Sequence, residues 1–268
     1  MNRIDARFES LRTAARKAFI PFLTAGDPDP DATVRLLEGA EAAGADLIEL
    51  GFPYSDPIAD GPTIQDSYHR VLQGGQDVAA VFEMVRRARH ACRLPIVAMA
   101  SYSLVFRMGF ERFVDRCLQA GIDGATVPDL PVDEADTLFP AARERGFRLI
   151  CFTAPSTVGH RRAMVARHAA GFIYYIAVRG TTGTRDTLPP DLFRNLAELK
   201  ALTPVPVAVG FGISTPEQAR EVSAAADGVI VGSAIVRLIA QAHARGDDPA
   251  AAALDLIARM ASAVKPGP

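Results

Sequence analysis

Residues 207–236 read VAVGFGISTPEQAREVSAAADGVIVGSAIV. Two short apolar runs, Val207–Val209 and Gly228–Val231, enclose a polar segment in which a Ser-Thr pair precedes Pro216. A hydroxyl residue followed by Pro in the first turn is typical of a helix start. The segment therefore predicts a strand, a helix and a second strand, which is the repeating unit of a parallel sheet.

The same alternation extends along the whole chain. Nearly continuous apolar runs, as in strands buried on both faces, occur at Phe19–Leu23, Leu47–Leu50, Ile96–Met99, Gly124–Val127, Arg148–Phe152, Phe172–Ala177, Val207–Val209 and Gly228–Val231. Helical spacing is found between them at Ala32–Ala43, Asp77–Ala91, Phe110–Ala120, Asp133–Arg145, Arg161–Ala169, Asp191–Leu202 and Pro216–Ala225. This pattern favours an α/β fold, a (β/α)8 TIM barrel. The alternative is an open doubly wound sheet, which usually has fewer strands.

No linker rich in Pro, Gly or Ser divides the 268 residues, so we expect residues 1–268 to form a single TIM-barrel domain. The amphipathic start, MNRIDARFESLRTAARKAF, predicts an extra N-terminal helix and has no apolar signal core. A C-terminal helix is expected at about Pro249–Val264.

Composition narrows the possible settings of the protein. The net charge is −2 and no block of five or more like charges occurs, so we expect no nucleic-acid partner. No apolar run approaches the roughly 18–20 residues of a membrane span, so no membrane association is expected. Three scattered Cys residues favour a reduced chain in the cytoplasm.

Two connections are longer than a strand and a helix require. They contain GFPYSDPIADGPTIQDS (51–67) and VRGTTGTRDTLPP (178–190). Both follow a strand and therefore lie at the carboxyl end of the barrel, where active sites of this fold are built. We interpret them as candidate lids over a site.

Carboxylates in and after the second strand are the candidate acid–base groups. Glu49 lies within an apolar strand, where burial would raise its pKa and suit it to proton transfer. A structural pairing with a barrel Lys or Arg is the alternative for this residue. Asp56 and Asp60 follow in the loop, where Asp often serves only to form a turn.

Glycines follow three late strands, at 180 and 183, at 210 and 212, and at 232. The loops after strands 7 and 8 of this fold, together with a helix start at Ser233, commonly bind a phosphate group. Simple tight turns are the alternative. The five His residues show no metal-ligand spacing, so no metal site is expected.

Several stretches together resemble the tryptophan synthase α subunit family. They are FLTAGDP (22–28), ELGFPYSDPIADGPTIQ (49–65), PDLPVDE (128–134), GFGIS (210–214) and VGSAIV (231–236). The resemblance implies a lyase that cleaves indole-3-glycerol phosphate to indole and glyceraldehyde 3-phosphate. It makes Glu49 and Asp60 the catalytic pair.

The resemblance also implies the binding residues. A phosphate site would comprise Gly183, Phe211, Gly212, Gly232 and Ser233, and the substrate pocket Phe22, Met99, Thr126, Phe152, Tyr174 and Thr182. It implies a β subunit as partner, in an α2β2 assembly, which would hold pyridoxal phosphate; this chain would need no cofactor. Residues 53–57 and 128–134 resemble the partner-facing loops.

The chain departs from the family pattern at Ser103, where Asn is expected, and in the segment Arg179–Gly183. Thr126 adds a hydroxyl to a pocket-facing strand. These departures admit two alternatives: a stand-alone lyase that releases free indole, or a weakly active barrel that mainly binds and activates a β subunit.

Overall fold

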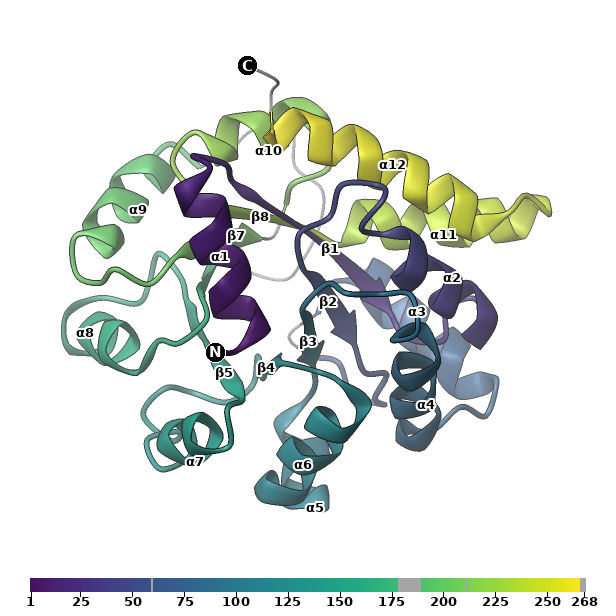
Figure 1. Ribbon diagram of the computed structural model, residues 1–268, viewed down its shortest axis with the longest axis horizontal. Coiled ribbons are helices and arrows are strands. Elements are labelled where there is room, and N and C mark those ends of the chain that lie inside the picture. Colours follow the sequence, from purple (N-terminus) through teal and green to yellow (C-terminus); the bar gives the residue numbers. More distant parts are fainter. Residues whose placement is uncertain (59, 178–188, 211, 266–268) are drawn as a thin grey trace.

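A closed barrel of parallel strands forms the centre of the computed structural model (Figure 1). Each strand pairs with the next along the chain, and the last pairs with the first. The strands are β1 (Ala18–Thr24), β2 (Ile48–Gly51), β3 (Ile96–Met99), β4 (Gly124–Thr126), β5 (Arg148–Thr153), β6 (Ile173–Ile176), β7 (Val207–Gly210) and β8 (Gly228–Val231). The prediction of a (β/α)8 barrel is confirmed, and the open-sheet alternative is wrong. The structure describes residues 1–58, 60–177, 189–210 and 212–265.

Helices surround the barrel and connect its strands (Figure 1). They are α2 (Pro30–Gly39), α3 (Pro62–Gln73), α4 (Val78–Ala88), α5 (Tyr102–Met108), α6 (Phe110–Ala120), α7 (Leu138–Glu144), α8 (Gly159–His168), α9 (Leu192–Lys200), α10 (Pro216–Ser223) and α11 (Ser233–Arg245). The predicted terminal helices are present as α1 (Arg3–Thr13) and α12 (Pro249–Val264). Among the helices of the described ranges, none combines the length and the apolar character needed to cross a bilayer.

Two helices were not predicted from the sequence. Helix α3 occupies part of the long connection after β2, which we interpreted as a loop. Its buried residues include Ile64, Tyr68 and Val71, which recur at helical spacing within an otherwise polar stretch. Helix α5 is short and begins after Ser101, whose hydroxyl accepts a hydrogen bond from the backbone N–H of Leu104.

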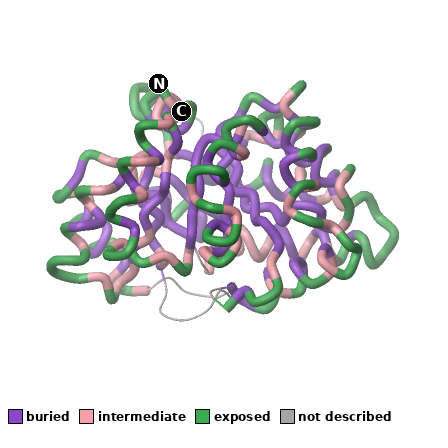
Figure 2. Tube along the Cα trace, turned by 90° about the horizontal axis from the view of Figure 1, so that it is seen from below, coloured by how far each residue is buried: buried purple, intermediate pink, exposed green. Residues whose placement is uncertain are grey.

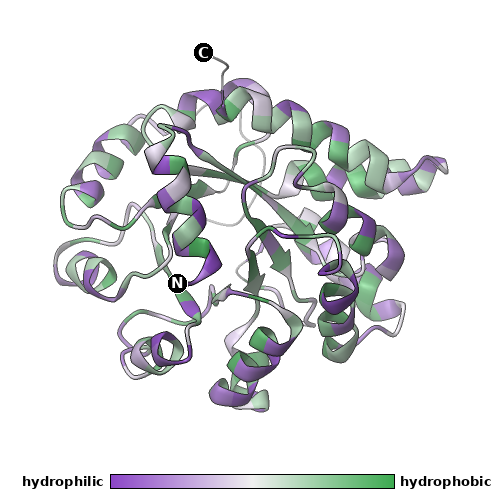
Figure 3. Ribbon diagram, viewed as in Figure 1, coloured by the Kyte–Doolittle hydropathy of each residue, from purple (hydrophilic) through white to green (hydrophobic). Residues whose placement is uncertain are grey.

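Side chains on the strands alternate between the barrel interior and the layer beneath the helices. On β6, Tyr174 packs in the interior cluster, whereas Tyr175 packs in the cluster under the helices. Both faces of each strand are therefore buried, as the purple central trace of Figure 2 shows. Most of the strand residues are accordingly green in Figure 3, while the helices alternate between polar and apolar residues.

Helix α1 closes the amino-terminal end of the barrel. Its buried residues Ile4, Phe8 and Leu11 belong to the same apolar cluster as the interior side chains of the strands. Because this end is filled, a ligand can reach the interior of the barrel from the carboxyl ends of the strands.

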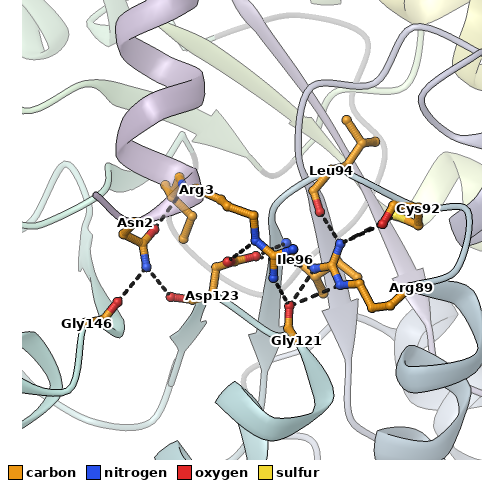
Figure 4. Close-up of polar contacts among 10 residues, drawn as sticks. Asn2, Arg3, Arg89, Cys92, Leu94, Ile96, Gly121, Asp123 and Gly146 are labelled. Carbon is orange, nitrogen blue, oxygen red and sulfur yellow. Dashed lines mark hydrogen bonds and ion pairs between the residues drawn. The ribbon is translucent and has the colours of Figure 1, made fainter.

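A polar network fastens α1 to this closed end (Figure 4). The Asp123 carboxylate, just before β4, accepts hydrogen bonds from Arg3 Nε at 2.6 Å and from the backbone N–H of Ile96 at 2.9 Å. Arg89 donates to Asp123 and to the carbonyl of Gly121. The carboxylate therefore connects a helix and two strands that are far apart in the sequence.

The same arrangement recurs at two other places on this end. Asp46 accepts from the backbone N–H of Phe19 at 2.8 Å, and Asp227 accepts from that of Val207 at 3.0 Å. Each carboxylate precedes one strand and binds the preceding strand of the barrel. Basic side chains pair with both, Arg7 with Asp46 and Lys200 with Asp227. These contacts give the amino-terminal end a structural role.

Candidate active site

A pocket opens at the carboxyl ends of the strands. Its lining residues come from several strands and the connections after them: Phe22, Glu49, Asp60, Ile64, Met99, Tyr174, Gly212, Ile213, Ile230, Gly232 and Ser233. All but Ile64, Ile213 and Ile230 are among the residues predicted from the sequence. Candidate acid–base groups, apolar walls and a helix start therefore share one pocket.

Glu49 points into this pocket from β2. Its neighbours Ile48 and Leu50 pack outward under the helices, so alternation turns Glu49 inward. The residue is 2% exposed, and Oε1 accepts a hydrogen bond from the Thr126 hydroxyl at 3.0 Å. Burial raises the pKa of this carboxyl to about 8, and the charge of Asp60 adds to the rise.

The alternative role of Glu49, a structural ion pair, has no support in the described part of the chain. No Lys or Arg there lies within ion-pair distance of its carboxylate, and Oε2 has no hydrogen-bond partner. A buried carboxyl without a cation stays protonated near neutral pH. A protonated carboxyl in this position is suited to giving a proton to a bound molecule.

Asp60 lies in the connection between β2 and α3 and has a different environment. The Tyr54 hydroxyl donates to its Oδ2 at 3.1 Å. Burial raises the Asp60 pKa to about 6, against the lowering effect of Tyr54. The Gln65 amide donates to the carbonyls of Pro57 and Asp60, which fixes this connection to the start of α3.

The two carboxyls therefore titrate in different ranges. Between about pH 6 and pH 8 the pocket holds a protonated Glu49 and an ionised Asp60. Carboxyl groups whose environments separate their pKa values can divide the acid and base steps of one reaction.

Aromatic side chains form the walls, and two glycines make room for them. A Cβ at position 51 would lie 2.5 Å from Cζ of Phe22, and a Cβ at position 210 would lie 2.4 Å from the Tyr174 hydroxyl. Either approach is closer than real Cβ atoms show, so Gly51 and Gly210 set the positions of both rings.

The opposite side of the pocket has the features of an anion site. Helix α11 begins at Ser233 directly after β8, and no side chain of the described residues caps it. Its first backbone N–H groups therefore remain available for an anion where Gly232 and Ser233 line the pocket. Gly212, with φ of +84°, lies beside them. The predicted residues Thr182, Gly183 and Phe211 lie outside the described residues.

Two predicted pocket residues, Thr126 and Phe152, do not line the pocket but contact residues that do. Thr126 does not line the pocket itself but contacts it through its hydrogen bond to Glu49. The ring of Phe152 packs against that of Tyr174, with 4.7 Å between centroids.

The sequence did not indicate Tyr54 as the hydrogen-bond partner of Asp60. It also did not indicate that Tyr68 packs against Tyr54. Tyr68 on α3 is completely buried, with its ring 5.4 Å from that of Tyr54. The helical spacing of Ile64 and Tyr68 is the sequence signal that could have predicted α3 and the packing of Tyr68 beside Tyr54. In the described ranges no three His, Cys, Asp or Glu side chains gather in a way that could hold a metal ion.

Comparison with known proteins agrees with this arrangement. A model of the family described as "Tryptophan synthase alpha chain" matches residues 8–265. The chain is 46% identical to the tryptophan synthase alpha chain of Rhodopirellula baltica over 256 residues, covering 93% of this chain and 92% of that protein. It is 48% identical to that of Citrifermentans bemidjiense over 237 residues, covering 88% and 89%.

The chain belongs to the tryptophan synthase alpha chain family. Solved structures agree. The crystal structure of tryptophan synthase subunit alpha from Legionella pneumophila is similar with a TM-score of 0.90 and 36% identity, covering 98% of each chain. A chain of the aminoacrylate-bound tryptophan synthase of M. tuberculosis gives a TM-score of 0.86 and 31% identity, covering 99% of this chain and all of that one.

The segment that departs from the alpha-chain pattern after β3 has an ordinary structural role. The Ser101 hydroxyl lies 2.9 Å from that of Ser103, and it caps α5. The backbone N–H of Tyr102 donates to Asp129 Oδ1 at 2.7 Å, which links the connections after β3 and β4. Ser103 thus contributes to a hydroxyl cluster at the helix start. The other atypical segment, Arg179–Gly183, lies outside the described residues.

Proposed function

We propose that the pocket binds indole-3-glycerol phosphate and cleaves it to indole and glyceraldehyde 3-phosphate, with Glu49 and Asp60 as the reacting pair. This retro-aldol cleavage is the lyase reaction of the alpha chain family, in tryptophan biosynthesis. The observation that carries the residue assignment is the pairing of two buried carboxyls with separated pKa values in a pocket that also contains an uncapped helix start.

Glu49 supplies the proton that makes the indole ring a leaving group. Its protonated carboxyl adds a proton to C3 of the indole, which gives the positively charged indoleninium ring. The bond from C3 to the side chain then breaks, and its electron pair returns to the ring. Glu49 takes the proton of the side-chain hydroxyl as the aldehyde forms, so the carboxyl ends the cycle protonated.

Asp60 stabilises the positive charge that develops on the ring. An ionised carboxylate accepts a hydrogen bond from the indole N–H, and this bond strengthens as the ring becomes cationic. Its pKa of about 6 keeps Asp60 ionised at neutral pH.

The phosphate group would lie at the start of α11, beside Gly212, Gly232 and Ser233. Backbone N–H groups and the helix dipole favour an anion there. Binding energy gained at this remote group is available for the bond that breaks. Phe22 and Met99 would pack against the apolar ring of the substrate.

The assignment is tested by measuring indole release from indole-3-glycerol phosphate by the purified chain. We expect Glu49→Gln and Asp60→Asn each to lower kcat/KM by about 10²–10⁴-fold. Glu38→Gln, on the exposed face of α2, serves as the matched control and should match the parent chain. Near-normal cleavage by Glu49→Gln would show that another group transfers the proton.

Alpha chains pair with a beta subunit, which holds the pyridoxal phosphate, and the alpha chain family carries no cofactor of its own. We infer that the partner docks around the pocket mouth. Two of the most exposed large apolar residues, Ile58 and Phe106, lie in the connections after β2 and β3, at this end of the barrel. The predicted partner-facing segments 53–57 and 128–134 lie at the same end.

Adding a beta subunit to the lyase assay separates the usual subunit from its alternatives. Strong stimulation of indole release indicates the usual alpha subunit, and high activity without a partner indicates a stand-alone lyase. Activation of the beta subunit without lyase turnover would indicate a binding module. We also propose a cytoplasmic setting, in keeping with three free, buried Cys residues, and a single domain over residues 1–268.

A further inference from the structure

The Thr126 hydroxyl reaches Glu49 across the barrel interior. Thr126 ends β4 and Glu49 lies on β2, so β3 separates their strands. The hydroxyl is 3.0 Å from Oε1 of Glu49 and 3.4 Å from the carbonyl oxygen of Ala98 on β3. Thr126 is completely buried, so water does not compete for this hydrogen bond.

The bond makes the two oxygens of Glu49 unequal. Oε1 accepts from Thr126, whereas Oε2 is buried and has no hydrogen-bond partner in the described part of the chain. Glu49 itself lines the substrate pocket. We propose that Thr126 is a positioning residue that holds Oε1 and so assigns to Oε2 the exchange of the proton with the substrate. This inference rests on the proposed catalytic role of Glu49.

The geometry suits a carboxyl that changes its protonation state within a turnover. When Glu49 is ionised, the hydroxyl donates to a charged oxygen, which is the stronger bond. When the proton is on Oε2, Oε1 is a carbonyl oxygen and still accepts from Thr126. The hydrogen bond therefore persists in both states, and the carboxyl keeps its orientation while the proton leaves and returns.

The other groups around Glu49 do not stabilise its ionised form as the Thr126 hydroxyl does. The titratable neighbours are Asp60 from the connection after β2, Tyr68 from α3 and Tyr174 from β6. Burial and the Asp60 charge raise the Glu49 pKa, and the hydrogen bond from Thr126 lowers it. No cation of the described ranges forms an ion pair with Glu49, so the hydroxyl is the main group there that favours the carboxylate.

The test replaces the hydroxyl without changing the shape of the side chain. Thr126→Val removes the hydrogen bond, Thr126→Ser restores it, and Thr153→Val is the matched control. Thr153 is on β5 beside Tyr175, so it faces away from the pocket. If the Thr126→Val variant does not fold, the Thr126→Ala variant replaces it in the same measurements.

We expect Thr126→Val to move the alkaline limb of the pH profile of kcat/KM, assigned to Glu49, upward by about 1 pH unit. The plateau kcat should fall about tenfold while KM stays within about twofold, because the substrate does not contact the hydroxyl. Thr126→Ser should return both values toward those of the parent chain. Thr153→Val should leave the profile unchanged.

Infrared titration supplies a readout that does not depend on turnover. The carbonyl-stretch band of protonated Glu49, assigned by its absence in Glu49→Gln, should persist to higher pH in Thr126→Val. An unmoved band and an unmoved limb in the folded variant would overturn the positioning role. A parent chain that does not cleave the substrate, or cleavage that survives Glu49→Gln, would instead overturn the proposed function.

Discussion

The Tyr54 hydroxyl lies 3.1 Å from Oδ2 of Asp60, and its hydrogen bond opposes the effect of burial on that carboxyl. Burial raises the Asp60 pKa to about 6, and the nearby charge of Asp129 adds to the rise. In the proposed reaction an ionised Asp60 accepts a hydrogen bond from the indole N–H. The hydrogen bond from Tyr54 would then set the lowest pH at which Asp60 is still ionised.

Tyr54→Phe should therefore narrow the pH optimum from its acidic side. Without the hydroxyl the Asp60 pKa rises, and the acidic limb of kcat/KM, near pH 6 in the parent chain, should move upward by about 1 pH unit. The measurement is a pH profile of indole release, with Tyr102→Phe on α5 as the control. If the limb stays near pH 6 in Tyr54→Phe, the hydrogen bond has no effect on catalysis.

Glu49→Gln should make the protein more stable near neutral pH while it removes activity. The folded-state pKa of Glu49 is about 8 against an ordinary value of 4.5, so the native state holds a proton that the unfolded state releases. This contribution is fully present below about pH 4.5, and it is lost as the pH rises toward 8. By pH 7 the loss amounts to up to ~3 kcal/mol, which the neutral amide avoids.

Thermal unfolding at several pH values checks this prediction. The Tm of Glu49→Gln should exceed that of the parent chain by several degrees at pH 7, and the difference should close below about pH 4.5. Glu38→Gln controls for the loss of a carboxylate at an exposed site. Equal stability of Glu49→Gln and the parent chain at pH 7 would mean that Glu49 is not held protonated.

A negative charge at the start of α11 should interfere with phosphate binding. Ser233→Asp places a carboxylate among the N–H groups that we assign to the phosphate, and its repulsion should raise KM by about 10–100-fold. Ser233→Ala removes only a hydroxyl and should raise KM far less. For both variants, the KM for the substrate and the inhibition constant of inorganic phosphate are measured. A KM for Ser233→Asp equal to that of Ser233→Ala would place the phosphate elsewhere.

The sequence indicates the barrel and the position of Glu49, because both depend on local patterns. Continuous apolar runs mark strands buried on both faces, and a carboxylate inside such a run stands out. The partners of the carboxyls depend on contacts between distant segments. Nothing near Thr126 in the sequence indicates that its hydroxyl reaches β2 across β3.

The long connection after β2 shows a second reason why parts of the site could not be predicted from the sequence. The polar stretch after β2 has the composition of a loop, yet Ile64, Tyr68 and Val71 form the buried face of α3. Apolar contacts with the barrel stabilise this helix, and short polar stretches do not reveal them in isolation. Tyr54 was similarly hidden, since its role follows from how α3 and Gln65 position Asp60.

Asp123→Ala should destabilise the barrel without changing its chemistry, because Asp123 acts at the end opposite the pocket. The substitution removes the acceptor of the backbone N–H of Ile96 and the anion that pairs with Arg3 and Arg89 (Figure 4). Arg89 is largely buried and would lose its charge partner, so the free energy of unfolding should fall by about 3 kcal/mol.

Denaturant unfolding measures this change in the free energy of unfolding. Arg12→Ala, which breaks an exposed ion pair with Glu9 on the same helix, should leave the midpoint unchanged. At a temperature where Asp123→Ala is fully folded, its kcat should equal that of the parent chain. A lower kcat with unchanged unfolding would contradict the division of the barrel into a structural end and a catalytic end.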